Sequence, residues 1–224
     1  MRRRRGVGSV KLREVENLHP AEVRVLGALL EKDMATPEYY PLTLNALQNA
    51  CNQKSSREPV VQYDEDTVSQ ALELLKNKGF VVRISGAGHR VEKFGHRMGE
   101  KLNLGRRELA LLCVLMLRGP QTVGELRGRT ERMHDFADMD EVEHVLNTLA
   151  GREEPLVARV ARGRWAHLFS GPPDLSAEPQ PSAAAPASDL EARVSANLEA
   201  RVSALEREVA ELRAQLAAFE RQFQ

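Results

Sequence analysis

The chain has 224 residues, enough for one large domain or for two or three small ones. Hydrophobic residues make up 42% of it and charged residues 29%, so it can bury a core and stay in solution. Lys and Arg total 32, and Asp and Glu also total 32, so the formal net charge is zero. This balance argues against a uniformly basic nucleic-acid-binding surface.

The few cysteines and the apolar runs narrow the class of protein further. Cys51 and Cys113 are too few for a disulfide framework or a structural zinc site, so we expect buried thiols in a reducing compartment. No apolar run approaches the roughly 18 residues of a membrane span. No apolar segment of the secretory type follows the basic N-terminus. These features predict a soluble cytoplasmic protein without membrane contacts.

The first 17 residues form a basic arm. They contain six basic residues and two acidic ones, a net charge of +4. Such a run is typical of a flexible arm that contacts nucleic acid. It is equally typical of a leader without function.

Residues 18–170 form the body of the chain and begin with a unit of three helices and a hairpin. Apolar residues at helical spacing predict helices over 23–32, 42–51 and 64–78. A strand-like run follows at 80–85, and Gly-containing residues 85–90 predict the turn of a β-hairpin.

The same order of elements returns in the second half of the body. Helices are predicted over 108–117, 122–130 and 138–152, followed by a strand at 156–161 and a turn at 161–164. The third helices match best, because residues 64–75 and 138–149 share the pattern D-x-D-x-V-x-x-(A/V)-L-x-x-L. Their Asp residues suit a helix N-terminus, and Thr122 with Glu125 fits a capping box.

Three helices followed by a β-hairpin are the plan of a winged-helix domain. We therefore predict a mainly α fold with small β-hairpin wings. It comprises a first winged-helix domain at 18–100 and a second at 101–170, and we call these ranges the first and second repeat.

The C-terminal part is predicted to be a linker and a coiled coil. Residues 171–188 contain five prolines, which favours an extended linker. Residues 189–224 form a charged helix whose heptads suit a parallel homodimer. The alternative is a helix that folds back on its own body. The expected dimer contacts are the apolar a and d positions, Val202, Leu205, Val209, Leu212, Leu216 and Phe219.

Two long motifs resemble those of a known family. Residues 22–65 are similar to the signature of the YceH-like bacterial proteins, with the run EVRVLGALLEKDMATPEYYPLTLNALQNACNQKSSREPVVQYDE. Residues 117–136 are similar to the signature of the same family. The resemblance implies a cytoplasmic protein with two winged-helix domains and assigns it no activity. One departure is Ser56, where the family pattern has Asn.

The charges of the body favour the wings over the third helices as a nucleic-acid surface. The outer faces of both third helices are acidic near their N-termini, which disfavours docking in the major groove. The wings are basic, and contacts from them go mainly to phosphates. Ordinary solvated hairpin side chains are the alternative. The predicted DNA contacts are Arg83, His89, Arg90, Lys93, Arg97, Arg159, Arg162 and Arg164.

A second candidate surface is the polar segment around the second helix of the first repeat. Its loop to the third helix is too long for a tight DNA-reading turn. The segment resembles a recognition surface for a protein or a nucleotide, although helix capping and loop closure also explain its Asn and Ser residues. Its residues are Tyr39, Tyr40, Asn45, Asn49, Asn52, Gln53, Lys54, Ser55 and Arg57.

Catalytic and metal motifs are not recognisable in the sequence. The acidic and His-containing run at 134–144 has metal-ligand residue types, but caps and a solvated helix face account for it. No phosphate-binding loop, nucleophile elbow or HExxH is present, so we expect no enzyme, metal or cofactor.

The sequence thus supports two functional hypotheses. The first is a dimeric DNA-binding regulator of transcription that uses its wings and arm. The second is a protein-binding module without DNA contacts, resembling the winged-helix partners of kleisins in chromosome segregation.

Overall fold

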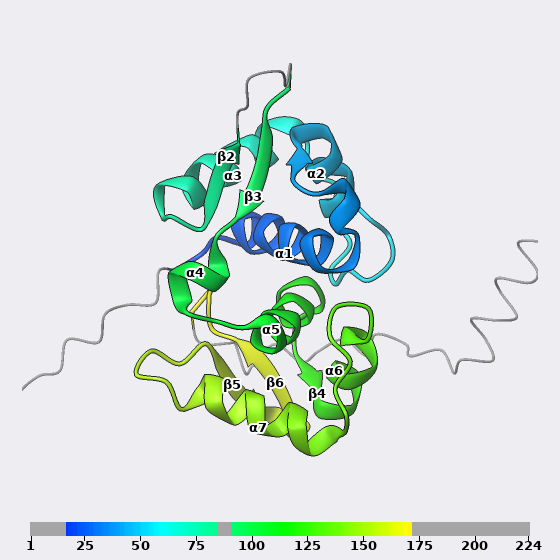
Figure 1. Cartoon of the computed structure of the whole chain (residues 1–224). Coiled ribbons are helices and arrows are strands. Elements are labelled where there is room, and N and C mark those ends of the chain that lie inside the picture. The colour runs from blue at the N-terminus through cyan, green and yellow to red at the C-terminus, as the bar shows by residue number, and fades with distance from the viewer. Residues whose placement is uncertain (1–16, 85–90, 172–224) are drawn as a thin grey trace, which may run out of the picture. The chain divides into compact units, whose positions relative to one another are not determined.

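The computed structural model describes residues 17–84 and 91–171 (Figure 1). All of them lie in one compact unit, Met1–Leu175. The described part is mainly helical with two small antiparallel sheets, in agreement with the predicted class. None of its helices is both long enough and apolar enough to cross a membrane.

The first repeat follows the predicted order of elements. It contains α1 (Pro20–Ala35), a 3-10 turn η1 (Pro37–Tyr39), β1 (Leu42–Thr43), α2 (Leu44–Cys51), α3 (Glu65–Asn77), β2 (Val81–Ile84) and β3 (Lys93–His96), and the short helix α4 (Met98–Leu102) crosses the boundary at residues 100 and 101. β3 is the central strand, between β1 and β2. The register pairs Val81 with His96 and Leu42 with Phe94.

The second repeat has the same order. It contains α5 (Arg106–Arg118), β4 (Gln121–Thr122), α6 (Val123–Thr130), α7 (Met139–Ala150), β5 (Val157–Val160), a 3-10 turn η2 (Ala161–Gly163) and β6 (Arg164–His167). β6 is central, between β4 and β5. The hairpin turns through Arg162 and Gly163, both with positive φ, as the glycine there predicts.

The predicted N-terminal caps of α3, α6 and α7 are confirmed. The carboxylates of Asp64 and Asp138 accept the backbone N–H groups of Thr67 and Glu141, each at 2.8 Å. At α6, Thr122 Oγ1 accepts the N–H of Glu125, and the Glu125 carboxylate accepts the N–H of Thr122. These side chains satisfy donors that a helix N-terminus leaves open.

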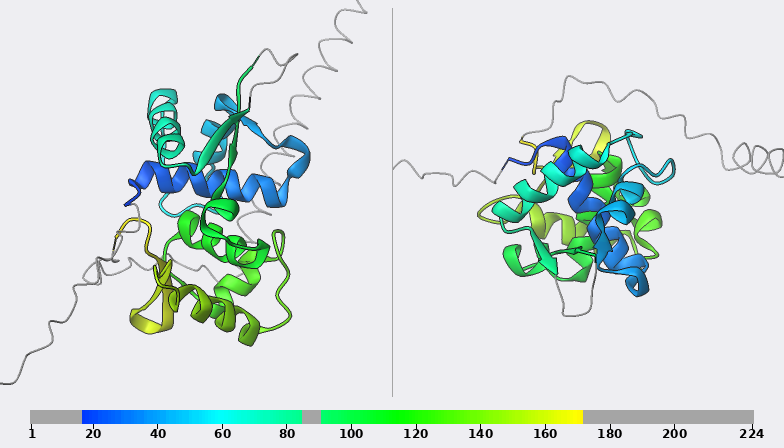
Figure 2. Two further views of the ribbon diagram at one scale, coloured as in Figure 1. Left: turned by 60° about the vertical axis from the view of Figure 1, so that its left-hand side comes forward. Right: turned by 90° about the horizontal axis from the view of Figure 1, so that it is seen from above.

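The two repeats share one hydrophobic core. α1 packs against α5, and these two helices lie between the remaining elements of the repeats (Figures 1 and 2). A single cluster of buried residues includes both helices. A Cβ on Gly27 of α1 would lie 2.9 Å from Leu117 Cδ2 of α5, so a larger residue there would force the Leu117 side chain to move.

Some elements are absent from the predictions. The two-residue strands β1 and β4 add a third strand to each predicted hairpin, and α4 follows the first sheet. These elements are too short for hydrophobic periodicity to reveal them.

Candidate functional site

The cations of the first wing are paired with carboxylates. Arg83 on β2 contacts Glu92 at 2.9 Å, and Arg97 contacts Glu100 at 2.7 Å. Lys93 begins β3 and forms no ion pair with any described residue. His89 and Arg90 lie outside the described residues.

The second wing shows the same pairing. Arg159 contacts Glu143 of α7 at 2.7 Å, and its guanidinium lies 5.5 Å from the centre of the Trp165 ring. Arg164 contacts Glu125 at 3.0 Å and also donates to the carbonyl of Pro120. Arg162 is exposed at the tip of the hairpin and makes no ion pair within the described ranges.

Most of the described wing cations therefore have an acidic neighbour. Four of the six predicted cations that the structure describes have a carboxylate within 3.0 Å. Exposed pairs of this kind contribute little to stability. They do reduce the positive potential that draws a phosphate backbone.

Arg57 of the predicted polar surface is a buried residue. Its side chain is 0% exposed and contacts the carboxylate of Glu31 on α1 with both terminal nitrogens, at 3.0 and 2.6 Å. It also donates to the carbonyl of Ala50 in the last turn of α2. Burial raises the pKa of Glu31, but the hydrogen bonds and charges of Arg57 and then of Lys32 together outweigh burial and lower it.

Arg24 is a second buried arginine at the same helix end. It donates to the carbonyl of Cys51 at 3.2 Å and to that of Pro59 at 2.5 Å. The end of α2 thus receives two guanidinium groups, which suits the negative end of the helix dipole. Burial, and then the charge of Arg57, lower the pKa of Arg24.

Tyr40 and Asn52 of the predicted surface also have structural contacts. The hydroxyl of Tyr40 accepts the backbone N–H of His96 at 2.6 Å, and burial raises its pKa. Asn52 exchanges two 2.8 Å hydrogen bonds with the backbone of Tyr63, which closes the loop before α3.

Burial also raises the pKa of the Cys51 thiol to about 12, as expected of an inert thiol.

The rest of the predicted polar surface is accessible. Tyr39 is 72% exposed, and Asn45 and Asn49 form a hydrogen bond of 3.1 Å along the exposed face of α2. Lys54 and Ser55 are exposed and Gln53 is partly exposed. The structure therefore divides the predicted set into three inward-facing residues and a larger group of six that is exposed or partly exposed.

Ser56 adopts a left-handed conformation with φ of 59°. Asn tolerates this region better than Ser does, which gives a physical reason for Asn in the pattern at this position. In this chain the Ser56 hydroxyl accepts a hydrogen bond of 2.6 Å from Arg118 of α5. The loop is thereby tied to the second repeat.

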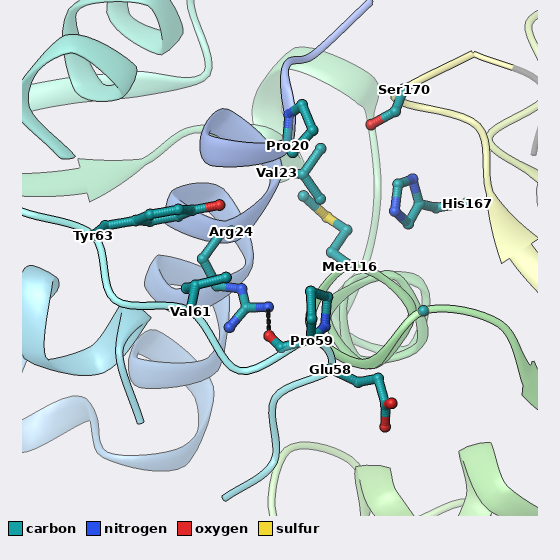
Figure 3. Close-up of a pocket in the computed structure, with 11 residues that line it drawn as sticks. Pro20, Val23, Arg24, Glu58, Pro59, Val61, Tyr63, Met116, His167 and Ser170 are labelled. Carbon is teal, nitrogen blue, oxygen red and sulfur yellow. Dashed lines mark hydrogen bonds between the residues drawn. The ribbon is translucent and has the colours of Figure 1, made fainter. Parts of the chain in front are cut away.

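A cavity of about 230 Å³ lies where α1, the loop after α2, the end of α5 and the segment after β6 meet (Figure 3). Its polar lining residues are Arg24, Glu58, Tyr63, His167 and Ser170, and none of them belongs to the predicted sites. Burial lowers the pKa of His167 to about 4, so the ring is neutral at pH 7. A sequence signal existed, because β3 (KFGH) and β6 (RWAH) end on equivalent histidines.

His96 and His167 share an unusual feature. The Nδ1 atom of each is buried and has no hydrogen-bond partner in the described part of the chain. The other nitrogen of His96 contacts Asp33 at 3.2 Å, and burial lowers the pKa of His96 against the pull of that carboxylate.

Two further predictions concern metals and the dimer. Residues 17–84 and 91–171 contain no group of three or more His, Cys, Asp or Glu arranged to hold a metal ion. The predicted dimer contacts, Val202, Leu205, Val209, Leu212, Leu216 and Phe219, lie outside the described residues.

Comparison with known proteins places the chain in a family. The model described as "Protein of unknown function, DUF480" matches residues 18–164. A UPF0502 protein of Solibacter usitatus is 51% identical over 211 residues, which cover 92% of this chain and 98% of the relative. A UPF0502 protein of Pelobacter propionicus is 49% identical over 217 residues, with the same coverage of both chains. A shorter match, 56% identical over 165 residues, is to a UPF0502 protein of Citrifermentans bemidjiense. The chain therefore belongs to the DUF480 family of bacterial proteins.

Proposed function

We propose that this protein is a non-catalytic scaffold of two winged-helix domains that binds a protein partner. The element order of each repeat, three helices with a three-stranded sheet, supports the winged-helix assignment. So does the resemblance to the YceH-like proteins. The observation that carries the choice of a protein partner is the pairing of the wing cations with carboxylates.

The third helices support the same choice. α3 begins with exposed Glu65 and Asp66, and α7 begins with exposed Met139 and Asp140. Acids at these positions repel phosphates, whereas they complement a basic segment of another protein. Met139 is 56% exposed and offers apolar contact beside the acids.

Charge reversal on two surfaces tests the proposal. Partners are captured from nuclease-treated cells with the full chain, with the acidic-face variant D66K/D140K and with the wing variant R83E/R159E. We expect the wild type and the wing variant to capture the same partner protein. The acidic-face variant should fail to capture it. Retention by all three chains would contradict the assignment of the surface.

DNA binding is the second candidate, supported by Arg162 at the hairpin tip and by the basic run at 1–17. If the wings hold DNA, affinity for random duplexes falls steeply with salt. R162E should then reduce the slope of log affinity against log salt concentration by an amount equal to about one phosphate contact. The reduction should be the same for every DNA sequence. R83E, which removes a cation already paired, is the matched control. Absence of binding at low salt would exclude this candidate.

We further propose that residues 189–224 join two chains as a parallel coiled coil, as the heptad pattern indicates. The expected result is a dimer for the full chain and a monomer for a chain that ends at residue 188. Sedimentation equilibrium distinguishes the two. A dimer that persists without the tail would place the interface elsewhere.

A further inference from the structure

The cavity described above has mostly apolar walls. Pro20 and Val23 come from the start of α1, Pro59 and Val61 from the loop after α2, and Met116 from α5. Figure 3 shows Arg24 on one side of this space and His167 on the other. An apolar pocket with a few convergent polar groups is the usual form of a small-molecule site.

Arg24 supplies positive charge without a carboxylate partner. Only 4% of the residue is exposed, and its two hydrogen bonds go to backbone carbonyls. No described acid forms an ion pair with it. Glu58 also borders the cavity, but its carboxylate points away from Arg24 (Figure 3). Buried charges in proteins are ordinarily paired, so this guanidinium suits an anion.

His167 supplies an unused hydrogen-bonding atom. Its Nδ1 has no partner among the described residues and no surface open to solvent, which costs free energy, so a hydrogen bond from a ligand to this atom requires a small shift of the ring. Burial alone lowers its pKa, so a neutral ring faces the cavity from β6. A neutral imidazole donates from one nitrogen and accepts at the other, and either role serves a polar ligand group.

We propose that this cavity binds a small apolar carboxylate, with the anion beside Arg24, a hydrogen bond to His167 and the apolar body against Val23, Val61 and Met116. The volume sets the size of the ligand. A dry cavity of about 150 Å³ accommodates benzene. A volume of about 230 Å³ therefore suits an aromatic ring or a branched chain that carries one carboxylate.

Benzoate is the probe, and the full chain is the protein. Binding is measured by calorimetry and by the melting temperature, which should rise by about 3–5 °C at ten times the dissociation constant. Benzyl alcohol, which has the ring without the charge, should bind at least tenfold more weakly. In NMR spectra of the histidine rings, the signals of His167 should shift on addition of benzoate while those of His96 stay in place.

Three variants locate the site. V61W fills the cavity and should abolish binding of benzoate. V60W changes the neighbouring residue, which is 54% exposed and does not border the cavity, and should leave binding intact. H167F keeps a ring of similar size without its nitrogens and should weaken binding at least tenfold. Equal binding by V61W and V60W, equal binding of benzoate and benzyl alcohol, or no binding of benzoate would each overturn the proposal.

Discussion

Arg57 donates in two directions at once, to the carboxylate of Glu31 and to the last turn of α2. Arg24 makes the second contact to that helix end. Charged residues of this kind are rarely buried without partners, because removing a charge from water is costly. At the residue scale, then, the polar loop before α3 is held from inside by side chains whose surroundings the sequence alone does not reveal.

Replacing Arg57 by Met should lower the free energy of unfolding by about 3 kcal/mol, because Glu31 would remain partly buried with only the longer contact to Lys32, at 3.4 Å. K54M, an exposed change in the same loop, should alter it by less than about 0.5 kcal/mol. Urea unfolding measures both. A loss equal to that of K54M would show that the Arg57–Glu31 contact contributes nothing.

His167 should make stability depend on pH in a defined range. Its pKa is about 4 in the folded chain and about 6.5 when unfolded. A depressed pKa means that its contribution is complete above pH 6.5 and is lost as pH falls toward 4. The free energy of unfolding should therefore fall by about 2–3 kcal/mol across this range.

The variant H167F isolates that contribution. It should lose less stability than the wild type between pH 6.5 and 4, whereas both chains keep the dependence on Glu31 at lower pH. Denaturant midpoints at several pH values provide the measurement. Identical curves for the two chains would contradict a neutral, buried His167.

At the element scale, the crossing of α1 and α5 depends on one small residue. Gly27 faces the side chains of Leu117 and Met116, and a methyl group added there would lie 2.9 Å from Leu117 Cδ2 unless that side chain moved. Cys113 Sγ contacts the Gly27 carbonyl at 3.5 Å, which shows how closely the helices approach. Interiors packed at this density transmit a small displacement to all neighbours.

Replacing glycine by alanine at two helical positions separates the effect of helix propensity on stability from the effect of side-chain packing. G27A should destabilise the protein by about 1–2 kcal/mol, because overpacking exceeds the gain in helix propensity. G128A on α6, where a Cβ meets nothing within 4 Å, should stabilise it by about 0.5–1 kcal/mol. Thermal unfolding compares them. Stabilisation by both changes would show that α1 and α5 are not tightly packed.

At the scale of the whole molecule, the two repeats depend on each other. α1 and α5 are each the first helix of a repeat, and each covers the apolar face of the other. Arg106 of the second repeat donates to the carbonyl of Met34 in the first, and Leu18 before α1 donates to Phe169 after β6. A repeat in isolation would expose this face to water.

We expect residues 17–171 to unfold in one cooperative transition. Calorimetric and van't Hoff enthalpies should agree, and a fragment of either repeat alone should lack a cooperative transition. Hydrogen exchange should show equal protection of the buried amides in α1 and α5. Two separate transitions, with fragments that keep native-like melting, would show instead that the repeats are independent domains.

Periodicity and capping residues are local properties, so the sequence alone determined the three longer helices of each repeat, the hairpin strands and their order. It also determined the buried thiols of Cys51 and Cys113. Contacts between residues that are distant in the sequence decided which charged side chains are paired and which are buried. The sequence shows a run of arginines, but only the fold shows that Arg159 and Arg164 lie beside Glu143 and Glu125. It shows Arg57 in a polar loop, but only the fold turns it inward to Glu31.

The formal net charge of zero does not describe any one surface of the protein. Net charge is a sum over the chain, whereas binding depends on which charges remain unpaired on one face. Tertiary structure pairs most of the described wing cations with acids and leaves Arg24 buried beside a cavity, without an ion pair to any described acid. Composition determined that a core forms, and only long-range packing decided which polar groups it encloses.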